Sequence, residues 1–413
     1  MDLIELTRKA EAELAPIFAD IDRTAFNNTA KVLNSFRTHK IDSTCFDGTS
    51  GYGYDDKGRD ALDKVYADVF GCEAAFVRHS IVNGTQAIAI ALYGLLRPGD
   101  VMLSVTGKPY DTLEQVIGIA GEAGNGSLAD FGVEYRQVDL IDGKVDFDSI
   151  EKQLAECGDR VKVAFIQRSK GYMTRPTLTC DEIAEIARFV KSRSNAYVVV
   201  DNCYGEFTEE KEPVAVGADL MMGSLIKNPG GGMAESGGYI AGCARAVELA
   251  SYRLTSVGVG LECGATLGNN KSLIKGFFYA PHTVAQAMKT MHFAAYIFEA
   301  MGFDVYPRWN ERRSDIIQSI KLGSPENMIK FCGGIQSGSP IDSYVAPIPD
   351  AMPGYLDKVI MAAGTFTQGA SIELSCDGPI REPYTIYMQG GLTYESGKFG
   401  VLMAAEKLLG DKA

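Results

Sequence analysis

Between residues 74 and 242 the sequence alternates short apolar segments with longer segments of helical period, and this alternation leaves few folds open to the chain. Strands this apolar, separated by helices of roughly ten to fifteen residues, indicate a mostly parallel sheet covered by helices on both faces. We therefore predict a doubly wound α/β domain. Asp146 or Asp148 is expected to cap the third helix. The predicted strands are residues 74–80, 101–105, 133–140, 161–169, 196–203, 218–225 and 237–242, and the predicted helices are residues 85–96, 110–121, 146–157 and 179–193.

A smaller α+β domain is predicted at the C-terminal end. The long helical stretch VAQAMKTMHFAAYIFEAMGF (284–303) leads away from the large domain. The segments VIMAAGTFTQGASIELSC (359–376) and YTIYMQGG (384–391) then alternate like strands. We expect three parts: an N-terminal helical arm, 1–50, a large domain, 51–290, and a small C-terminal domain, 291–413.

Composition and motifs argue against several classes of function. The 413-residue chain has a formal charge of −13 and no basic block, which disfavours a nucleic-acid partner. Its least polar run, IVNGTQAIAIALYGLL, is too short and too polar to span a bilayer, and its N-terminus lacks the pattern of a signal peptide. Nine scattered cysteines without a C-x-x-C pair, and four histidines without ligand spacing, disfavour a disulfide framework or a metal site. We therefore expect a reducing, cytoplasmic location.

The first candidate site is a strand-to-helix turn at Asn83, Gly84 and Thr85, within HSIVNGTQAIAIAL (79–92). In doubly wound sheets the functional residues collect at the carboxyl ends of strands. A glycine there lets backbone N–H groups point outward, and the following helix adds the positive end of its dipole. The turn could therefore bind a phosphate without a cation. An ordinary capped helix start would explain the same residues.

The second candidate is Asp201, which directly follows three valines in VVVDNCYGEF. A carboxylate at the end of a buried strand needs a partner to remain charged, and a protonated ring nitrogen would serve. Tyr204, three residues later, could hydrogen-bond another part of the same ligand. A metal or helix-cap role for this aspartate is the competing interpretation.

The third candidate is Lys227, isolated from other charges in GSLIKNPGGG (223–232). A lysine becomes a nucleophile near neutral pH only when burial depresses its pKa, and the apolar segment before it could provide that burial. Ser224 could supply an oxygen to a phosphate. The competing interpretation is a solvated loop lysine.

The fourth candidate is Tyr110 in GKPYDTLEQVIG (107–118), whose ring could stack on a planar ligand. Taken together, the four features match the requirements of pyridoxal phosphate: a lysine for its aldehyde, a carboxylate for its ring nitrogen, a helix start for its phosphate and an aromatic face. We therefore predict this cofactor, attached to Lys227.

The segments around these residues, including GSLIKNPGGGMAESGGYIAG (223–242), resemble those of fold-type I pyridoxal phosphate enzymes. More closely, they are similar to the methionine gamma-lyase and cystathionine beta-lyase-like family whose members are often called aluminium-resistance proteins. The resemblance spans about residues 25 to 410. It implies a transferase-like fold of this type, with Lys227 as the attachment lysine, Asp201 on the ring nitrogen, and Asn83, Gly84, Thr85 and Ser224 on the phosphate. Tyr110 would stack on the ring and protonate the leaving group.

The resemblance also implies an oligomer with shared active sites, at least a homodimer and by expectation a tetramer. Related lyases carry a Tyr-x-Arg segment that reaches the phosphate of the neighbouring subunit. In GYGYDDKGRD (51–60), Tyr52 fits this pattern, but Tyr54 stands where arginine is expected. Whether Arg59 compensates is left open.

Family members usually hold the substrate carboxylate with a C-terminal arginine, and Arg381 in SIELSCDGPIREPY (371–384) is the candidate. A surface ion pair is the alternative for this residue. The implied reaction is carbon–sulfur lysis of methionine, cystathionine or a cysteine-like amino acid, by removal of the α-proton and β- or γ-elimination. Transamination on the same fold, or a binding protein without turnover, are the other hypotheses.

Overall fold

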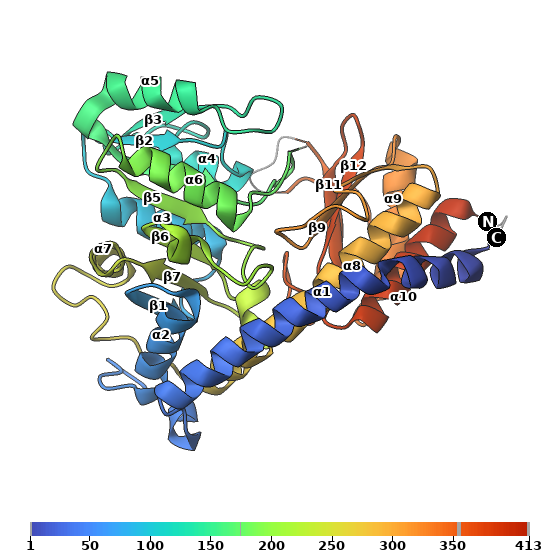
Figure 1. The fold of residues 1–413 in the computed structure, drawn as a ribbon, viewed down its shortest axis with the longest axis horizontal. Coiled ribbons are helices and arrows are strands. Elements are labelled where there is room, and N and C mark those ends of the chain that lie inside the picture. Colours follow the sequence, from blue (N-terminus) through green and yellow to red (C-terminus); the bar gives the residue numbers. More distant parts are fainter. Residues whose placement is uncertain (1, 174, 353–356, 411–413) are drawn as a thin grey trace. The chain divides into compact units, whose positions relative to one another are not determined.

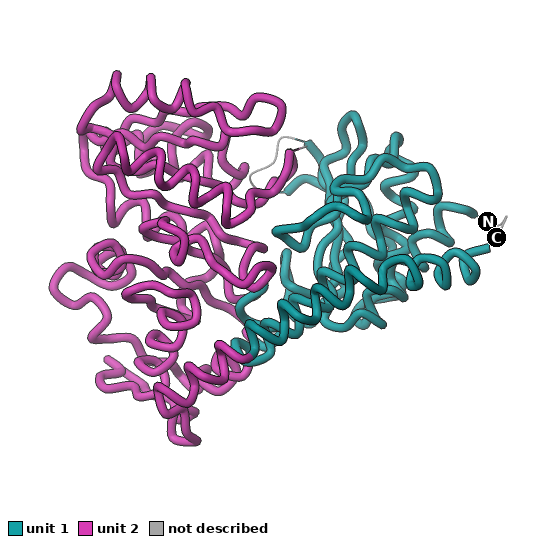
Figure 2. The backbone as a smooth tube through the Cα atoms, in the orientation of Figure 1, with its two compact units in different colours: residues 1–29, 226–233, 276–413 teal, residues 30–225, 234–275 magenta. Residues whose placement is uncertain are grey.

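The computed structural model describes residues 2–173, 175–352 and 357–410. The backbone divides into two compact units (Figure 2): unit 1 is Met1–Thr29, Ile226–Met233 and Gly276–Ala413, and unit 2 is Ala30–Leu225 and Ala234–Lys275. Two long helices, α1 (Leu3–Thr38) and α8 (Asn270–Ala300), contribute residues to both units. The boundary predicted at residue 290 therefore falls inside α8, and the three-part division remains a prediction.

Unit 2 contains a seven-stranded sheet in the order β1-β7-β6-β5-β4-β2-β3 (Figure 1). Strands β6, β5, β4, β2 and β3 pair in parallel, whereas β7 is antiparallel to both of its neighbours. This arrangement confirms the predicted mostly parallel sheet. The strands are β1 (Ala74–Arg78), β2 (Val101–Ser104), β3 (Glu134–Gln137), β4 (Val161–Gln167), β5 (Tyr197–Asp201), β6 (Leu220–Ser224) and β7 (Gly238–Gly242).

Both faces of this sheet are covered. Val198, Val199 and Val200 are consecutive residues of β5 and each is 0% exposed, so side chains on either face are buried. The helices of unit 2 are α2 (Lys57–Phe70), α3 (Gly84–Leu95), α4 (Asp111–Ile117), α5 (Phe147–Cys157), α6 (Cys180–Lys191) and α7 (Ala244–Leu254).

Two helix termini show how local sequence sets element boundaries. Of the two aspartates predicted to cap α5, Asp146 does so, because its carboxylate accepts the Ser149 N–H at 3.0 Å. Helix α4 covers only part of the predicted segment. It ends at Gly118, whose φ of 93° is a left-handed conformation that glycine adopts at low cost.

Unit 1 contains a five-stranded antiparallel sheet in the order β10-β11-β12-β9-β8. Its core packs residues of these strands against α1, α8 and two further helices. A smaller α+β domain was predicted for the C-terminal part, and its sheet is antiparallel. Its elements are β8 (Asp304–Tyr306), β9 (Ile317–Lys321), β10 (Val359–Ala362), β11 (Ser375–Pro379), β12 (Thr385–Gln389), α9 (Pro325–Ser337) and α10 (Tyr394–Leu409).

Short 3₁₀ helices connect several of these elements. All nine cysteines are free thiols. Within the described ranges, no helix is long and apolar enough to cross a membrane. The 3₁₀ helices are η1 (Ser43–Phe46), η2 (Gly158–Arg160), η3 (Pro213–Val216) and η4 (Asn228–Gly230).

Candidate active site

The carboxyl ends of β5 and β6 bring two of the predicted residues to one edge of the sheet. Asp201 is the last residue of β5 and pairs with Met222 of β6. Ser224 ends β6 two residues further along. Both side chains are buried, with Asp201 8% and Ser224 1% exposed. Their burial means that any ligand reaching them would meet an environment of low dielectric constant, where charges interact strongly.

The predicted phosphate turn lies against the same edge. A Cβ atom added at Gly84 would lie 3.0 Å from Sγ of Cys203 and 3.6 Å from Cβ of Ser224. Asn83 is the N-cap of α3, and its side chain accepts the Gln86 N–H at 2.8 Å. The first N–H groups of a helix have no partner within the helix. We call residues 83–85, 201–204 and 224 the strand-end site. The start of α3 therefore packs against Cys203 and Ser224, and helix N-termini are a common place for anions to bind.

The loop after β5 holds Asp201 in a defined environment. The Cys203 N–H donates a hydrogen bond to Oδ1 of Asp201 at 3.1 Å, which orients the carboxylate. Tyr204 and Phe207 have φ angles of 73° and 61°. Left-handed conformations cost non-glycine residues roughly 1–2 kcal/mol each, so contacts around the loop must maintain them.

Lys227 lies three residues after Ser224, just before η4, and its side chain is half-buried. The segment that contains it belongs to unit 1. The Ile372 N–H donates to the Ile226 carbonyl at 2.9 Å. A Cβ atom at Gly231, where φ is 55°, would lie 2.3 Å from the Gly276 carbonyl oxygen of α8. The glycines after Lys227 therefore let this segment pass close to α8.

Tyr110 is the N-cap of α4, and its ring centroid lies 5.8 Å from that of Tyr172. The hydroxyl oxygens of Thr85 and Thr112 are 2.8 Å apart, so the starts of α3 and α4 are linked. The structure thereby ties Tyr110's helix to the phosphate turn. Tyr172 was missed in the sequence because its segment, after β4, had no recognised motif.

The loop that carries Tyr52 and Tyr54 is well anchored, although both rings are exposed (74% and 60%). The two rings stack with centroids 5.6 Å apart. Arg59 is buried, and its Nη1 donates to the carbonyls of Gly53 and Gly264 at 2.6 and 3.0 Å. Arg59 therefore holds the loop, and contacts of either tyrosine with a partner's phosphate remain a prediction.

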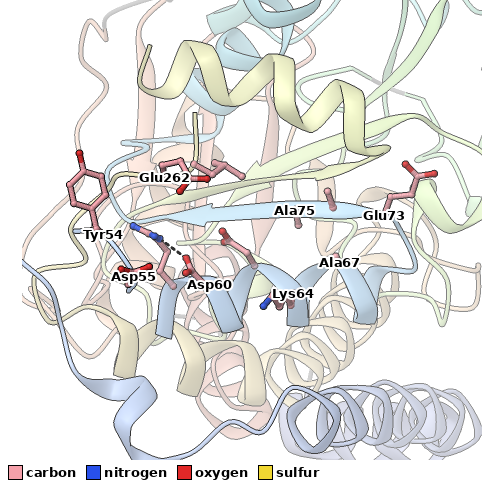
Figure 3. A pocket seen from close by; sticks show the side chains of 12 residues that line it. Tyr54, Asp55, Asp60, Lys64, Ala67, Glu73, Ala75 and Glu262 are labelled. Carbon is pink, nitrogen blue, oxygen red and sulfur yellow. Dashed lines mark hydrogen bonds and ion pairs between the residues drawn. The ribbon is translucent and has the colours of Figure 1, made fainter. Parts of the chain in front are cut away.

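A separate cavity of about 550 Å³ lies beside this loop (Figure 3). Five carboxylates line it, against only two cationic side chains, so its potential disfavours a phosphate group. Among the residues the structure describes, no group of three or more side chains has the geometry to hold a metal ion. We do not assign the cofactor to this cavity. Its lining is Tyr54, Asp55, Arg59, Asp60, Asp63, Lys64, Ala67, Glu73, Ala74, Ala75, Leu261 and Glu262.

Arg381 forms an ion pair with Asp357, with Nη1 and Oδ2 3.0 Å apart. Its side chain is 53% exposed. This contact corresponds to the surface-pair alternative for Arg381, and exposed pairs of this kind contribute little to stability. Binding of the substrate carboxylate by Arg381 remains a prediction.

Glu206 is a buried carboxyl that the sequence did not single out. It is 0% exposed, and its Oε1 accepts the Tyr239 hydroxyl at 2.7 Å. Burial raises its pKa from 4.5 to about 8. The folded protein therefore binds a proton at Glu206 over a pH range in which the unfolded chain releases it.

Replacing Glu206 with glutamine is expected to flatten the dependence of stability on pH. Because the folded pKa lies above the unfolded one, the stability contribution is complete below pH 4.5 and is lost as the pH rises through about 8. The loss amounts to about 1.4 kcal/mol per pH unit, and the substituted amide would not titrate. Urea unfolding at several pH values measures it. The exposed Glu185→Gln variant is the control, and equal slopes in all three proteins would contradict the prediction.

The chain matches the sequence profile of methionine gamma-lyase over residues 3–409. It belongs to the methionine gamma-lyase family. Protein YnbB of Bacillus subtilis is 53% identical over 403 residues, which cover 97% of this chain and 95% of YnbB. The match to the family profile confirms the resemblance inferred from the sequence motifs.

Solved structures agree with the family assignment. A carbon–sulfur lyase involved in aluminium resistance from Clostridium novyi has a TM-score of 0.93 and 50% identity, covering 97% of this chain and 94% of that one. A Clostridium acetobutylicum protein, provisionally described as a cystathionine beta-lyase involved in aluminium resistance, has a TM-score of 0.95 and 50% identity, with 98% and 95% covered. The pyridoxal-5'-phosphate-dependent protein YhfS of Escherichia coli shares the fold, with a TM-score of 0.64 and 16% identity over 95% and 96% of the two chains. The predicted fold class, that of pyridoxal phosphate-dependent enzymes, is confirmed.

Proposed function

We propose that this protein is a pyridoxal phosphate-dependent carbon–sulfur lyase that acts on a sulfur-containing amino acid. The observation that carries the proposal is the approach of Gly84 to Cys203 and Ser224 at the sheet edge where β5 ends in Asp201. Membership of the methionine gamma-lyase family supports the same cofactor and reaction class. Methionine, cystathionine and cysteine-like compounds are the candidate substrates.

Each proposed role follows from the chemistry of one side chain. Backbone N–H groups of the Gly84 turn and the Ser224 hydroxyl would hold the phosphate. The Asp201 carboxylate would accept a hydrogen bond from the protonated ring nitrogen and keep that proton in place. Lys227 would carry the cofactor and, once its amine is released, take the α-proton of the substrate.

The remaining roles concern the substrate and its leaving group. When bound, the cofactor supplies a sink for the electron pair left by removal of the α-proton. Tyr110 would then donate its hydroxyl proton to the departing thiolate. Addition of water gives a 2-oxo acid, ammonia and a thiol as products. Arg381 remains the proposed ligand of the substrate carboxylate, after exchange of its partner Asp357.

The assembly and location are also proposals. We propose a cytoplasmic homo-oligomer with shared active sites, a dimer that pairs further into a tetramer. Tyr52 and Tyr54 would reach the partner's phosphate in this assembly. Their exposure on an anchored loop supports such a contact.

Product analysis tests the reaction against its nearest alternative. Purified protein loaded with cofactor is incubated with methionine, cystathionine or cysteine, with and without an added 2-oxo acid. A lyase releases ammonia, thiol and 2-oxo acid in equal amounts without a co-substrate. Turnover that requires the added 2-oxo acid and releases no ammonia would indicate an aminotransferase, which the Asp201 to Tyr204 spacing also allows. Cofactor binding without any turnover would indicate a binding protein.

A further inference from the structure

A buried polar cluster lies next to Asp201, where β4 and β5 end. Arg168 follows the last residue of β4, Asn202 follows the last residue of β5, and both side chains are 0% exposed. Nη1 of Arg168 donates to Oδ1 of Asn202 at 2.8 Å, and Nη2 donates to Oε1 of Glu209 at 2.7 Å. Nδ2 of Asn202 donates to Oε2 of Glu212 at 3.0 Å. Both ends of the Asn202 amide are thus engaged, which fixes its orientation.

The same two residues hold the backbone on either side of Asp201. The Arg168 N–H donates to the Asp201 carbonyl at 3.1 Å. The Asn202 N–H donates to the Met222 carbonyl at 3.0 Å. The next N–H along the chain, that of Cys203, donates to the Asp201 carboxylate. Rotation of the backbone at Asn202 would therefore move the donor that orients the carboxylate.

The loop beyond Asn202 also depends on this cluster. A Cβ atom at Gly205 would lie 2.4 Å from Nη1 of Arg168, so the guanidinium packs tightly against the loop backbone. The Phe207 N–H donates to Oε1 of Glu212 at 2.8 Å, and Phe207 is one of the loop residues with a positive φ. Strained loop conformations persist where surrounding contacts determine them. The titratable or charged side chains of the cluster are Arg168, Cys180, Glu206, Glu209 and Glu212.

We propose that Arg168 and Asn202 are positioning residues that set the orientation of the Asp201 carboxylate and thereby keep the ring nitrogen of the cofactor protonated. The proposal rests on the proposed function, in which Asp201 contacts that nitrogen. Neither residue needs to touch the cofactor. A role in fold stability alone is the competing explanation, and it predicts no change in ring protonation once the cofactor is bound.

The test reads ring protonation directly. Wild type and variants are loaded with pyridoxal phosphate labelled with ¹⁵N in the ring, and the ¹⁵N chemical shift, which reports protonation of that nitrogen, is followed from about pH 6 to pH 9. The variants are Asn202→Ala and the milder Arg168→Lys, which keeps a buried cation beside the glutamates. Ile186→Val, in the buried face of α6, is the control for core destabilisation. Asp201→Ala is the reference for loss of the carboxylate.

We expect wild type and Ile186→Val to keep the ring protonated throughout. Asn202→Ala and Arg168→Lys should instead release the proton within this pH range, at least one unit below the pH at which wild type would release it, which is a tenfold or greater weakening of proton binding. If either folded variant titrates like wild type while Asp201→Ala loses the proton, the positioning role is wrong and the proposed function stands. If wild type takes up no cofactor, or Asp201→Ala does not alter the titration, the proposed function and the inference both fail.

Discussion

Asp201→Asn is expected to lower kcat by about 10²–10⁴-fold, the range found when a group that controls a proton in catalysis is removed. Asparagine has the same shape as aspartate, and its Oδ1 can still accept the Cys203 N–H, so the loop after β5 should remain intact. What is lost is the negative charge that, in the proposed mechanism, keeps the ring nitrogen protonated. The cofactor would bind but withdraw electrons poorly.

Steady-state kinetics of thiol release, on protein with a measured cofactor content, checks this prediction. Asp148→Asn, an exposed position in the first turn of α5, is the matched control and should behave like wild type. A wild-type kcat in Asp201→Asn would show that Asp201 is a structural carboxylate, and the assignment of the strand-end site would have to change.

Lys227→Ala is expected to reduce turnover at least as strongly, by about 10²–10⁴-fold or more, because the proposed mechanism makes this one residue both the attachment point and the base. Folding should be little affected, since the segment is held by main-chain contacts such as the Ile372 N–H to the Ile226 carbonyl. Small added amines should restore part of the activity by taking over proton transfer.

The control for this variant is Lys271→Ala, an exposed lysine near the start of α8. It should retain full activity. Substantial lysis by Lys227→Ala in the absence of added amine would mean that another base removes the α-proton. The proposed role of Lys227 in catalysis would then be withdrawn, whatever its role in attachment.

The sequence predicted the fold where one physical signal dominated. The three valines before Asp201 could be accommodated only in a strand buried on both faces, and the structure buries them completely. The antiparallel direction of β7 was not predictable in the same way. The apolar residues at 238–242 indicate that this strand is buried. The direction in which the strand runs depends instead on the path of the preceding loop.

The helices show the same difference between features set by local sequence and features that local sequence does not determine. The aspartate that caps α5 was predictable because the cap is local in sequence. The length of α8 was not, because it continues without a break from unit 2 into unit 1.

For the candidate site, the rule that functional residues collect at strand ends selected the residues, and their use as a cofactor site stays a prediction. It placed Gly84 and Ser224 at the end of the sheet where Asp201 lies, and their approach is observed. Arg168 escaped notice because its partner Asn202 is distant in sequence and pairs with it only through the adjacency of β4 and β5. Buried charges cannot be recognised from sequence without knowing which residues surround them.

Locating the cofactor on the chain tests the central claim most directly. Purified protein is loaded with pyridoxal phosphate, reduced with borohydride, digested and analysed by mass spectrometry, with Lys227→Ala treated in parallel. We predict a yellow protein whose visible absorption disappears on reduction and whose pyridoxyl phosphate label lies on the peptide that contains Lys227, with no stable label in the variant. A protein that stays colourless with added cofactor, or a label on another lysine in wild type, would contradict the account.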